Sequence, residues 1–240
     1  MIRHVGVVVP AANEAYLLDR CLRALRASRS DLHRAHCYVV RTRIVLVLDS
    51  CTDASAAIAA GYPDIEVIEA SVRSVGRARN AGVQHLLRSG VRASEHWLAN
   101  TDADSQVPTA WLAGMVDEAD RGAHLVIGTV TPDSRLPGVV DAAWHARHPQ
   151  RDDHPHVHGA NFGIRADAYT ALGGWPLLTT GEDQTLADRA RAAGHLRISR
   201  TARLPVRTSV RLEGRAPSGF SSYLRDLGHA DLCPAEQNAA

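Results

Sequence analysis

The chain contains no lysine: all 27 of its Lys and Arg residues are arginine. This absence excludes a Schiff-base lysine and the lysine of a phosphate-binding loop. Only four cysteines occur, and no two of them form a C-x-x-C pair, so neither a zinc framework nor a disulfide scaffold is expected. The net charge of +1 gives no overall attraction to nucleic acid or to an anionic membrane surface.

Long apolar runs are also absent. No run approaches the roughly 18 residues that cross a bilayer, and the N-terminus enters an apolar strand without the layout of a signal peptide. We therefore expect a cytoplasmic protein without a transmembrane segment. Its 240 residues, 45% hydrophobic and 22% charged, are typical of a globular chain with one large domain or two fused halves.

Short apolar runs alternate with helical patterns, above all in the first hundred residues. Strands are predicted at 5–9, 44–48, 65–68, in the run before Asp102, and at 125–130, 161–164 and 204–210. Helices are predicted after Asn13, which is interpreted as an N-cap, and at 53–60, 76–87, 108–121, 166–172, 182–193 and 220–227, with a loop at 145–158. Continuous apolar strands that alternate with helices predict a parallel sheet covered on both faces.

Carboxylates follow two of these predicted strands directly. Asp49 comes after the second strand, and Asp102 and Asp104 come after the fourth, separated by Ala103. Ligands of such sheets bind beyond the carboxyl ends of the strands. On extended chain the two carboxylates of an Asp-x-Asp triplet point the same way, and such a pair suits Mg²⁺ or Mn²⁺ together with substrate phosphates. A solvated turn is the alternative interpretation.

Several motifs in order resemble those of the family 2 glycosyltransferases. The matching segments are Pro10-Ala11-Ala12-Asn13-Glu14, Asp49-Ser50-Cys51-Thr52-Asp53, Ala78-Arg79-Asn80-Ala81-Gly82, Asp102-Ala103-Asp104, Gly173-Gly174-Trp175 and Gly181-Glu182-Asp183. The resemblance covers about residues 4–195. It implies an α/β fold of the GT-A type, a Rossmann-like, mostly parallel sheet flanked by helices with a smaller acceptor-binding half.

The resemblance also implies a domain plan. It predicts one domain over 1–228, with a nucleotide-binding half at 1–104, an acceptor half at 105–228 and a flexible tail at 229–240. Two departures from the family pattern stand out: Leu48 replaces the first of two paired aspartates, and the Gln/Arg-x-x-Arg-Trp motif of the processive synthases is missing. A small, non-processive transferase is therefore expected.

By this resemblance the enzyme is a metal-dependent glycosyltransferase that moves a sugar from a nucleotide-sugar donor, UDP-linked in preference, to a hydroxyl of a small or lipid-linked acceptor. The implied donor-binding residues are Pro10, Ala11, Ala12, Glu14, Asp49, Arg79, Asp102 and Ala103. Asp49 can accept a hydrogen bond from uracil N3–H, and the forked guanidinium of Arg79 suits a diphosphate. Glu14 as a first-turn carboxylate and Arg79 on a solvated helix face are the alternatives.

The implied metal is Mn²⁺ or Mg²⁺, with Asp104 as direct ligand and Asp102 on ribose or a metal-bound water. His158 is a candidate third ligand, although most such histidines are ordinary loop residues. A separate zinc site among the five histidines of 145–158 matches no zinc spacing.

The implied catalytic base is Asp183, supported by Glu182, in a single displacement that inverts the anomeric carbon. Carboxylates that merely open a helix are the alternative. The implied acceptor-binding residues are Gly159, Ala160, Asn161 and Trp175, the last as a platform for a sugar face or as a half-buried core residue. The stretch 208–215 is interpreted as a lid over the diphosphate or as an exposed basic loop.

Rival functions fit the sequence less well. A sugar-1-phosphate nucleotidyltransferase needs a glycine-rich loop after the first strand, and a nicotinamide dehydrogenase needs G-x-G-x-x-G after a strand; neither is present. A catalytically inactive nucleotide-sugar-binding protein remains an alternative. The oligomeric state is open, and a homodimer is one option.

Overall fold

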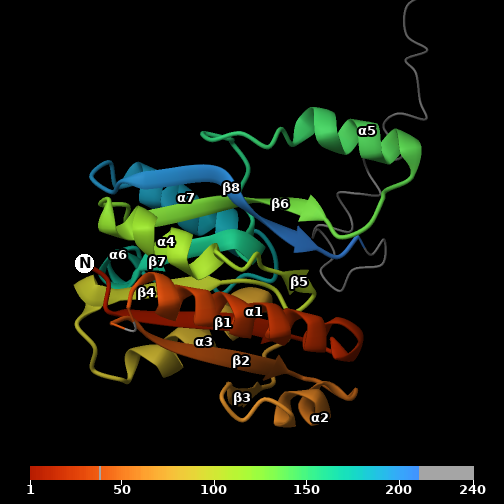
Figure 1. The fold of residues 1–240 in the computed structure, drawn as a ribbon, viewed down its shortest axis with the longest axis horizontal. Coiled ribbons are helices and arrows are strands. Elements are labelled where there is room, and N and C mark those ends of the chain that lie inside the picture. The colour runs from red at the N-terminus through yellow and green to blue at the C-terminus, as the bar shows by residue number, and fades with distance from the viewer. Residues whose placement is uncertain (38, 211–240) are drawn as a thin grey trace, which may run out of the picture.

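A computed structural model describes residues 1–37 and 39–210, which form an eight-stranded sheet with helices on both faces (Figure 1). The strand order is β3-β2-β1-β4-β7-β6-β8-β5. The helix predicted at 220–227, the tail at 229–240, the domain limit at 228 and the 211–215 part of the predicted lid lie outside the described residues. No helix among the described residues is long and apolar enough to cross a membrane.

The strands are β1 (His4–Ala11), β2 (Arg41–Asp49), β3 (Glu66–Ala70), β4 (His96–Asn100), β5 (Ser105–Gln106), β6 (Leu125–Pro132), β7 (Phe162–Arg165) and β8 (Ile198–Thr208). Strands β3, β2, β1 and β4 run parallel to one another. Strand β7 runs antiparallel between β4 and β6, and β6 is parallel to β8. The predicted α/β architecture of a mostly parallel sheet flanked by helices is confirmed.

The helices are α1 (Ala15–Ala35), α2 (Ser55–Ala60), α3 (Val75–Leu87), α4 (Trp111–Asp120), α5 (Gly138–Arg147), α6 (Ala166–Ala171) and α7 (Glu182–Ala192), with 3₁₀ turns η1 (Ala93–Glu95) and η2 (Gly159–Asn161). The start of the loop predicted at 145–158 was wrong, because α5 includes its first three residues and ends at Arg147. Among the described side chains of α5 only Trp144 is buried, so the helix carries almost no apolar periodicity.

Two cores lie on opposite faces of the sheet because strand side chains alternate. Val5, Val7 and Val9 of β1 pack in the core that includes the apolar face of α1. Val8 points the other way, into the core that includes α3. A Cβ on Gly82 of α3 would lie 2.5 Å from a Val8 methyl carbon, so glycine permits this close helix–sheet contact.

The ends of β1, β2 and β4 meet at one edge of the sheet. Strand β1 pairs with β2 on one side and β4 on the other, which makes this edge a topological switch point. The N-cap expected from Asn13 was wrong. Its side-chain Oδ1 accepts from the backbone N–H groups of Thr52 and Asp53, and the Asp53 carboxylate accepts from the first N–H of α1, that of Ala15. The loop between β1 and α1 and the loop between β2 and α2 therefore stabilise each other through these hydrogen bonds.

Candidate active site

The Asp102-Ala103-Asp104 triplet lies in a turn after β4, which differs from the extended chain predicted for it. The turn is closed by a hydrogen bond from Ser105 N–H to the Asp102 carbonyl. The two carboxylates consequently have different partners. Asp102 faces Arg79, whereas Asp104 Oδ1 accepts from the hydroxyls of Ser105 at 3.2 Å and Thr208 at 3.5 Å.

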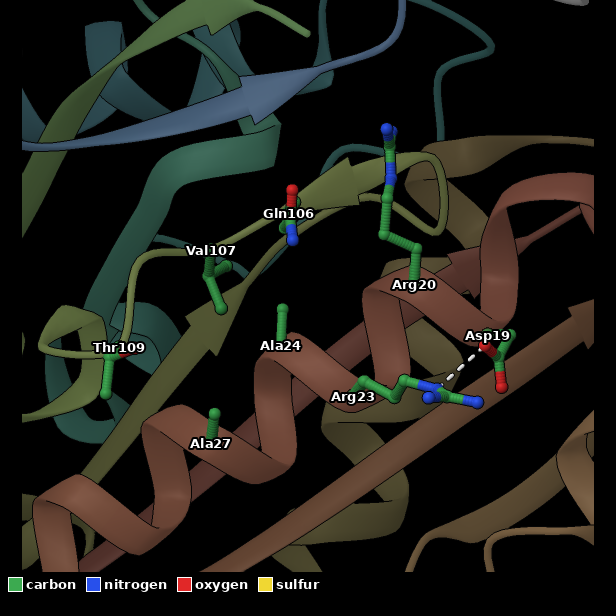
Figure 2. Close-up of a pocket in the computed structure, with 8 residues that line it drawn as sticks. All are labelled: Asp19, Arg20, Arg23, Ala24, Ala27, Gln106, Val107 and Thr109. Carbon is green, nitrogen blue, oxygen red and sulfur yellow. Dashed lines mark ion pairs between the residues drawn. The ribbon is translucent and has the colours of Figure 1, made fainter.

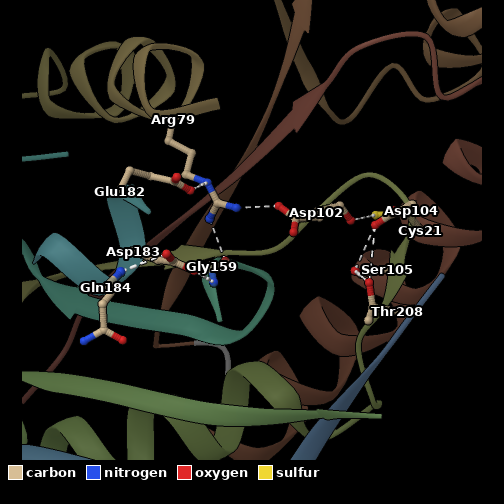
Figure 3. Close-up of polar contacts among 10 residues, drawn as sticks. All are labelled: Cys21, Arg79, Asp102, Asp104, Ser105, Gly159, Glu182, Asp183, Gln184 and Thr208. Carbon is tan, nitrogen blue, oxygen red and sulfur yellow. Dashed lines mark hydrogen bonds and ion pairs between the residues drawn. The ribbon is translucent and has the colours of Figure 1, made fainter. Parts of the chain in front are cut away.

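The guanidinium of Arg79 lies at the centre of a polar cluster (Figure 3). It donates to Asp102 Oδ1 at 2.5 Å and to the Gly159 carbonyl at 2.6 Å, and its Nε lies 3.5 Å from Glu182 Oε1. Its carbon Cζ lies 5.2 Å from the ring centroid of Trp175, and the side chain is only 2% exposed. Arg79 is predicted to contact the donor diphosphate, but in the structure its N–H groups are directed at protein groups.

The first residues of α7 bring two further carboxylates to this cluster. Gly181 adopts φ 74° at the N-cap, a left-handed conformation that glycine tolerates. Glu182 follows it and is buried. Asp183 is less buried, and its two oxygens accept from the N–H groups of Gly159 at 2.7 Å and Gln184 at 2.8 Å. The N-terminal end of a helix stabilises both negative charges.

Charge and burial compete within the cluster. Burial raises the pKa of the Asp102 carboxyl above its ordinary value, and the Arg79 guanidinium opposes part of that rise. Burial also raises the pKa of Glu182, again opposed by Arg79. Arg79 is thus the cation that favours the ionised form of both carboxyls.

Asp49 ends β2 and is 5% exposed. Its Oδ1 accepts from the N–H groups of Val72 and Arg73 and from the Ser50 hydroxyl, and its Oδ2 accepts from Ser74 N–H. The carboxylate therefore holds the segment that leads into α3. Among the other residues predicted at the donor, Ala11 and Ala103 are buried, while Pro10, Ala12 and Glu14 are partly exposed.

Two residues predicted to contact the acceptor are core residues in the structure. Trp175 is 2% exposed and packs 5.0 Å from the ring of Phe162, so it offers no face to a sugar. Asn161 is also 2% exposed; its Oδ1 accepts from Trp111 Nε1, and its Nδ2 donates to the carbonyls of Thr129 and Leu204. Gly159 and Ala160 are buried beside them.

Replacing Asn161 by alanine is expected to lower the free energy of unfolding by about 2–4 kcal/mol, because it leaves the buried indole N–H of Trp111 without an acceptor and two carbonyls without a donor. Equilibrium urea denaturation measures this loss. Gln84→Ala, an exposed amide on α3, is the matched control. A stability within about 0.5 kcal/mol of wild type would contradict the structural role.

His158 lies in a stack of aromatic rings. The ring of His148 lies 3.7 Å from that of Trp144 and 4.2 Å from that of His156, which is followed by His158 at 6.1 Å. Burial, with the neighbouring imidazoles, lowers the pKa of His158 to about 3. Within residues 1–37 and 39–210 no three His, Cys, Asp or Glu side chains converge as a metal site.

A groove of about 520 Å³ lies along α1, outside the polar cluster (Figure 2). Arg20 stands at its end near the Asp-x-Asp turn, where its Nη2 donates to the Asp104 carbonyl and to the Asp133 carboxylate. Sequence reasoning missed Arg20 because no motif marks it. Ser105, which donates to Asp104, was not predicted at the site either. Thr208, the other hydroxyl on Asp104, is the first residue of the stretch 208–215 that is interpreted as a lid.

The fold is similar to those of three solved glycosyltransferases. S. aureus TarS 1-349 in complex with UDP has a TM-score of 0.61 and 15% identity over 99% of this chain and 67% of that chain. The mannosyltransferase PcManGT from Pyrobaculum calidifontis in complex with GDP-Man and Mn²⁺ has a TM-score of 0.62 and 21% identity over 93% and 60%. Glucosyl-3-phosphoglycerate synthase from Mycobacterium tuberculosis, in complex with Mn²⁺, UDP and phosphoglyceric acid, has a TM-score of 0.53 and 15% identity over 83% and 68%.

This chain thus spans between 60% and 68% of the length of those three solved chains. No curated protein matches it in sequence. Residues 6–172, well over half of the chain, match the family described as Glycosyl transferase family 2. The chain therefore belongs to glycosyl transferase family 2.

Proposed function

We propose that this enzyme transfers one sugar from a nucleotide-sugar donor, in preference a UDP-sugar, to a hydroxyl acceptor, with help from Mn²⁺ or Mg²⁺. The observation that carries the proposal is the polar cluster at the switch point. It joins Asp102, at the end of β4, to Glu182 and Asp183, at the start of α7. A carboxylate for the donor side and a carboxylate for proton transfer are thereby held in one site.

The donor side is supported by Asp49 and by the small residues that end β1. Oδ2 of Asp49 accepts one hydrogen bond from Ser74, and an ionised carboxylate oxygen has capacity for a second, such as that from uracil N3–H. Ala11 and Ala12 let a base approach the backbone closely. The complexes of TarS with UDP and of the glucosyl-3-phosphoglycerate synthase with UDP are consistent with this choice of nucleotide.

The residues of the Asp-x-Asp turn fit a divalent cation. Asp104 is the proposed direct ligand; its Oδ1 accepts from the neutral hydroxyls of Ser105 at 3.2 Å and Thr208 at 3.5 Å. Asp102 is paired with Arg79 and suits a contact with ribose or with water. The cation, when bound, would supply positive charge to the leaving diphosphate. Mn²⁺ accompanies the donor or UDP in two of the similar structures.

Asp183 is the proposed base. Its two oxygens each accept one backbone N–H, which orients the carboxylate and leaves each oxygen a further lone pair. It takes the proton of the acceptor hydroxyl while the acceptor oxygen bonds to the anomeric carbon. The bond from that carbon to the donor phosphate breaks, and the nucleoside diphosphate leaves with the electron pair. Such a single displacement inverts the anomeric configuration.

Calorimetric titration of UDP into the protein with and without Mn²⁺ tests the donor and metal assignments. We expect UDP to bind, and to bind at least about tenfold more tightly with Mn²⁺. A screen for UDP or GDP release from UDP-glucose, UDP-galactose, UDP-N-acetylglucosamine and GDP-mannose then identifies the donor. Absent binding, or binding that ignores the metal, would refute the proposal, and binding without release from any donor would favour an inactive nucleotide-sugar-binding protein.

A further inference from the structure

The buried position of Arg79 assigns it a role other than donor binding. Its side chain is 2% exposed, so a diphosphate in the site cannot reach the guanidinium without displacing protein groups. Both terminal nitrogens already donate, one to Asp102 and one to the Gly159 carbonyl. A buried guanidinium is retained only where such partners compensate for its lost hydration. The geometry therefore directs Arg79 at the protein.

The partners of Arg79 come from the two halves of the chain. Asp102 follows β4 in the first half, whereas Gly159 and Glu182 belong to the second. The contact with Gly159 spans 80 residues of sequence. One planar guanidinium can bind both sides at once because its donors form a fixed fork. Arg79 thus ties the turn that carries the donor-side aspartates to the elements that carry the base.

Gly159 extends this link to the base. Its carbonyl accepts from Arg79, and its N–H donates to Asp183 Oδ2. A Cβ on this residue would lie 2.5 Å from the guanidinium nitrogens, so the guanidinium in this position occupies space that any larger residue at 159 would need. The path from Arg79 through Gly159 to Asp183 consists of two short hydrogen bonds, 2.6 and 2.7 Å long. A shift of Arg79 is therefore transmitted to the proposed base.

We propose that Arg79 is a positioning residue, which fixes the orientation of Asp183 relative to the Asp102-Ala103-Asp104 turn without touching either substrate. This inference rests on the proposed function, in which Asp183 is the base and the turn serves the donor. It replaces the expectation that Arg79 binds the donor diphosphate. The two roles differ in what they do to affinity and to turnover.

The test compares Arg79→Gln and Arg79→Lys with Arg88→Gln, an exposed arginine at the far end of the same helix. Turnover is measured as UDP release at saturating UDP-sugar, and calorimetry gives the dissociation constants of UDP and of UMP with Mn²⁺. For Arg79→Gln we expect kcat to fall roughly 100-fold through misplacement of the base. The ratio of UMP to UDP dissociation constants should stay at the wild-type value. Arg79→Lys, which keeps the charge without the fork, should recover part of the loss, and Arg88→Gln should behave as wild type.

Two results would overturn the inference: a kcat of Arg79→Gln near that of wild type, or a loss of about tenfold or more in the preference for UDP over UMP. The second result would indicate that Arg79 contacts the donor diphosphate after all. Should Arg79→Gln lose its cooperative melting transition, Arg79→Lys carries the test, with kcat and the nucleotide preference judged in the same way. Failure of the proposed function is separate, since wild type would then show no metal-dependent binding of UDP.

Discussion

Replacing Asp183 by asparagine is expected to lower kcat for sugar transfer by about 10²- to 10⁴-fold, because the amide cannot take the proton of the acceptor hydroxyl. Donor binding should be retained, since Asp183 lies on the base side of the cluster, with Arg79 and Asp102 between it and Asp104 in Figure 3. Stopped or continuous assays of UDP release give kcat, and calorimetry with UDP and Mn²⁺ gives the donor affinity.

The structure also predicts a small cost in stability for this variant. Each oxygen of Asp183 accepts one backbone N–H, from Gly159 or from Gln184, and an asparagine can accept only one of them. We expect a loss of about 1 kcal/mol in the free energy of unfolding. Asp188→Asn, an exposed aspartate on the same helix that pairs with Arg191, is the matched control and should keep full activity. Unchanged turnover in Asp183→Asn would refute the base assignment.

The second large effect is expected from Asp104→Asn, which should abolish the increase in UDP affinity that Mn²⁺ gives to wild type. An amide oxygen is a weaker ligand than a carboxylate and does not neutralise the cation, so we expect UDP binding in Mn²⁺ to weaken by about tenfold or more, the factor expected from the cation. The fold should persist, since Asp104 accepts from two neighbouring hydroxyls that an amide oxygen can also satisfy.

Titrations of UDP over a series of Mn²⁺ concentrations measure this effect. Asp117→Asn changes an exposed aspartate on α4 and serves as the control for the loss of one negative charge. A metal dependence equal to that of wild type in Asp104→Asn would remove this residue from the metal site. If the dependence of UDP binding on Mn²⁺ were reduced in Asp102→Asn and not in Asp104→Asn, Asp102 would be the metal ligand in place of Asp104.

Much of the fold of residues 1–104 follows from local sequence pattern. The apolar runs at 5–9 and 44–48 lie within β1 and β2, and the helix predicted at 76–87 differs from α3 by one residue. These elements are predictable because each buries side chains at a regular period, which short stretches of sequence record directly. Strand β5, of two residues, carries no such period, and α5 has too few buried side chains to reveal one.

The residues of the proposed site likewise fall into those that sequence pattern can predict and those that it cannot. The order and spacing of the motifs identify the family and place Asp49, Asp102, Asp104 and Asp183 at the ends of elements, because chain direction in an alternating β-α pattern brings those ends to one edge. The roles of Arg79, Asn161 and Trp175 could not be obtained from pattern. Each depends on burial and on partners distant in sequence, such as Gly159 for Arg79 and Trp111 for Asn161.

The roles of such residues cannot be predicted for a physical reason. Local periodicity records which side of a helix or strand is apolar, but it does not record which polar groups from distant parts of the chain will contact that element in the fold. Composition and motif order in this chain were enough for the fold class and the family, and they single out the acidic groups of the proposed site. Only the packed chain could show that a guanidinium predicted to face a diphosphate is buried against Asp102 and Gly159, or that a predicted sugar platform, Trp175, lies inside the core.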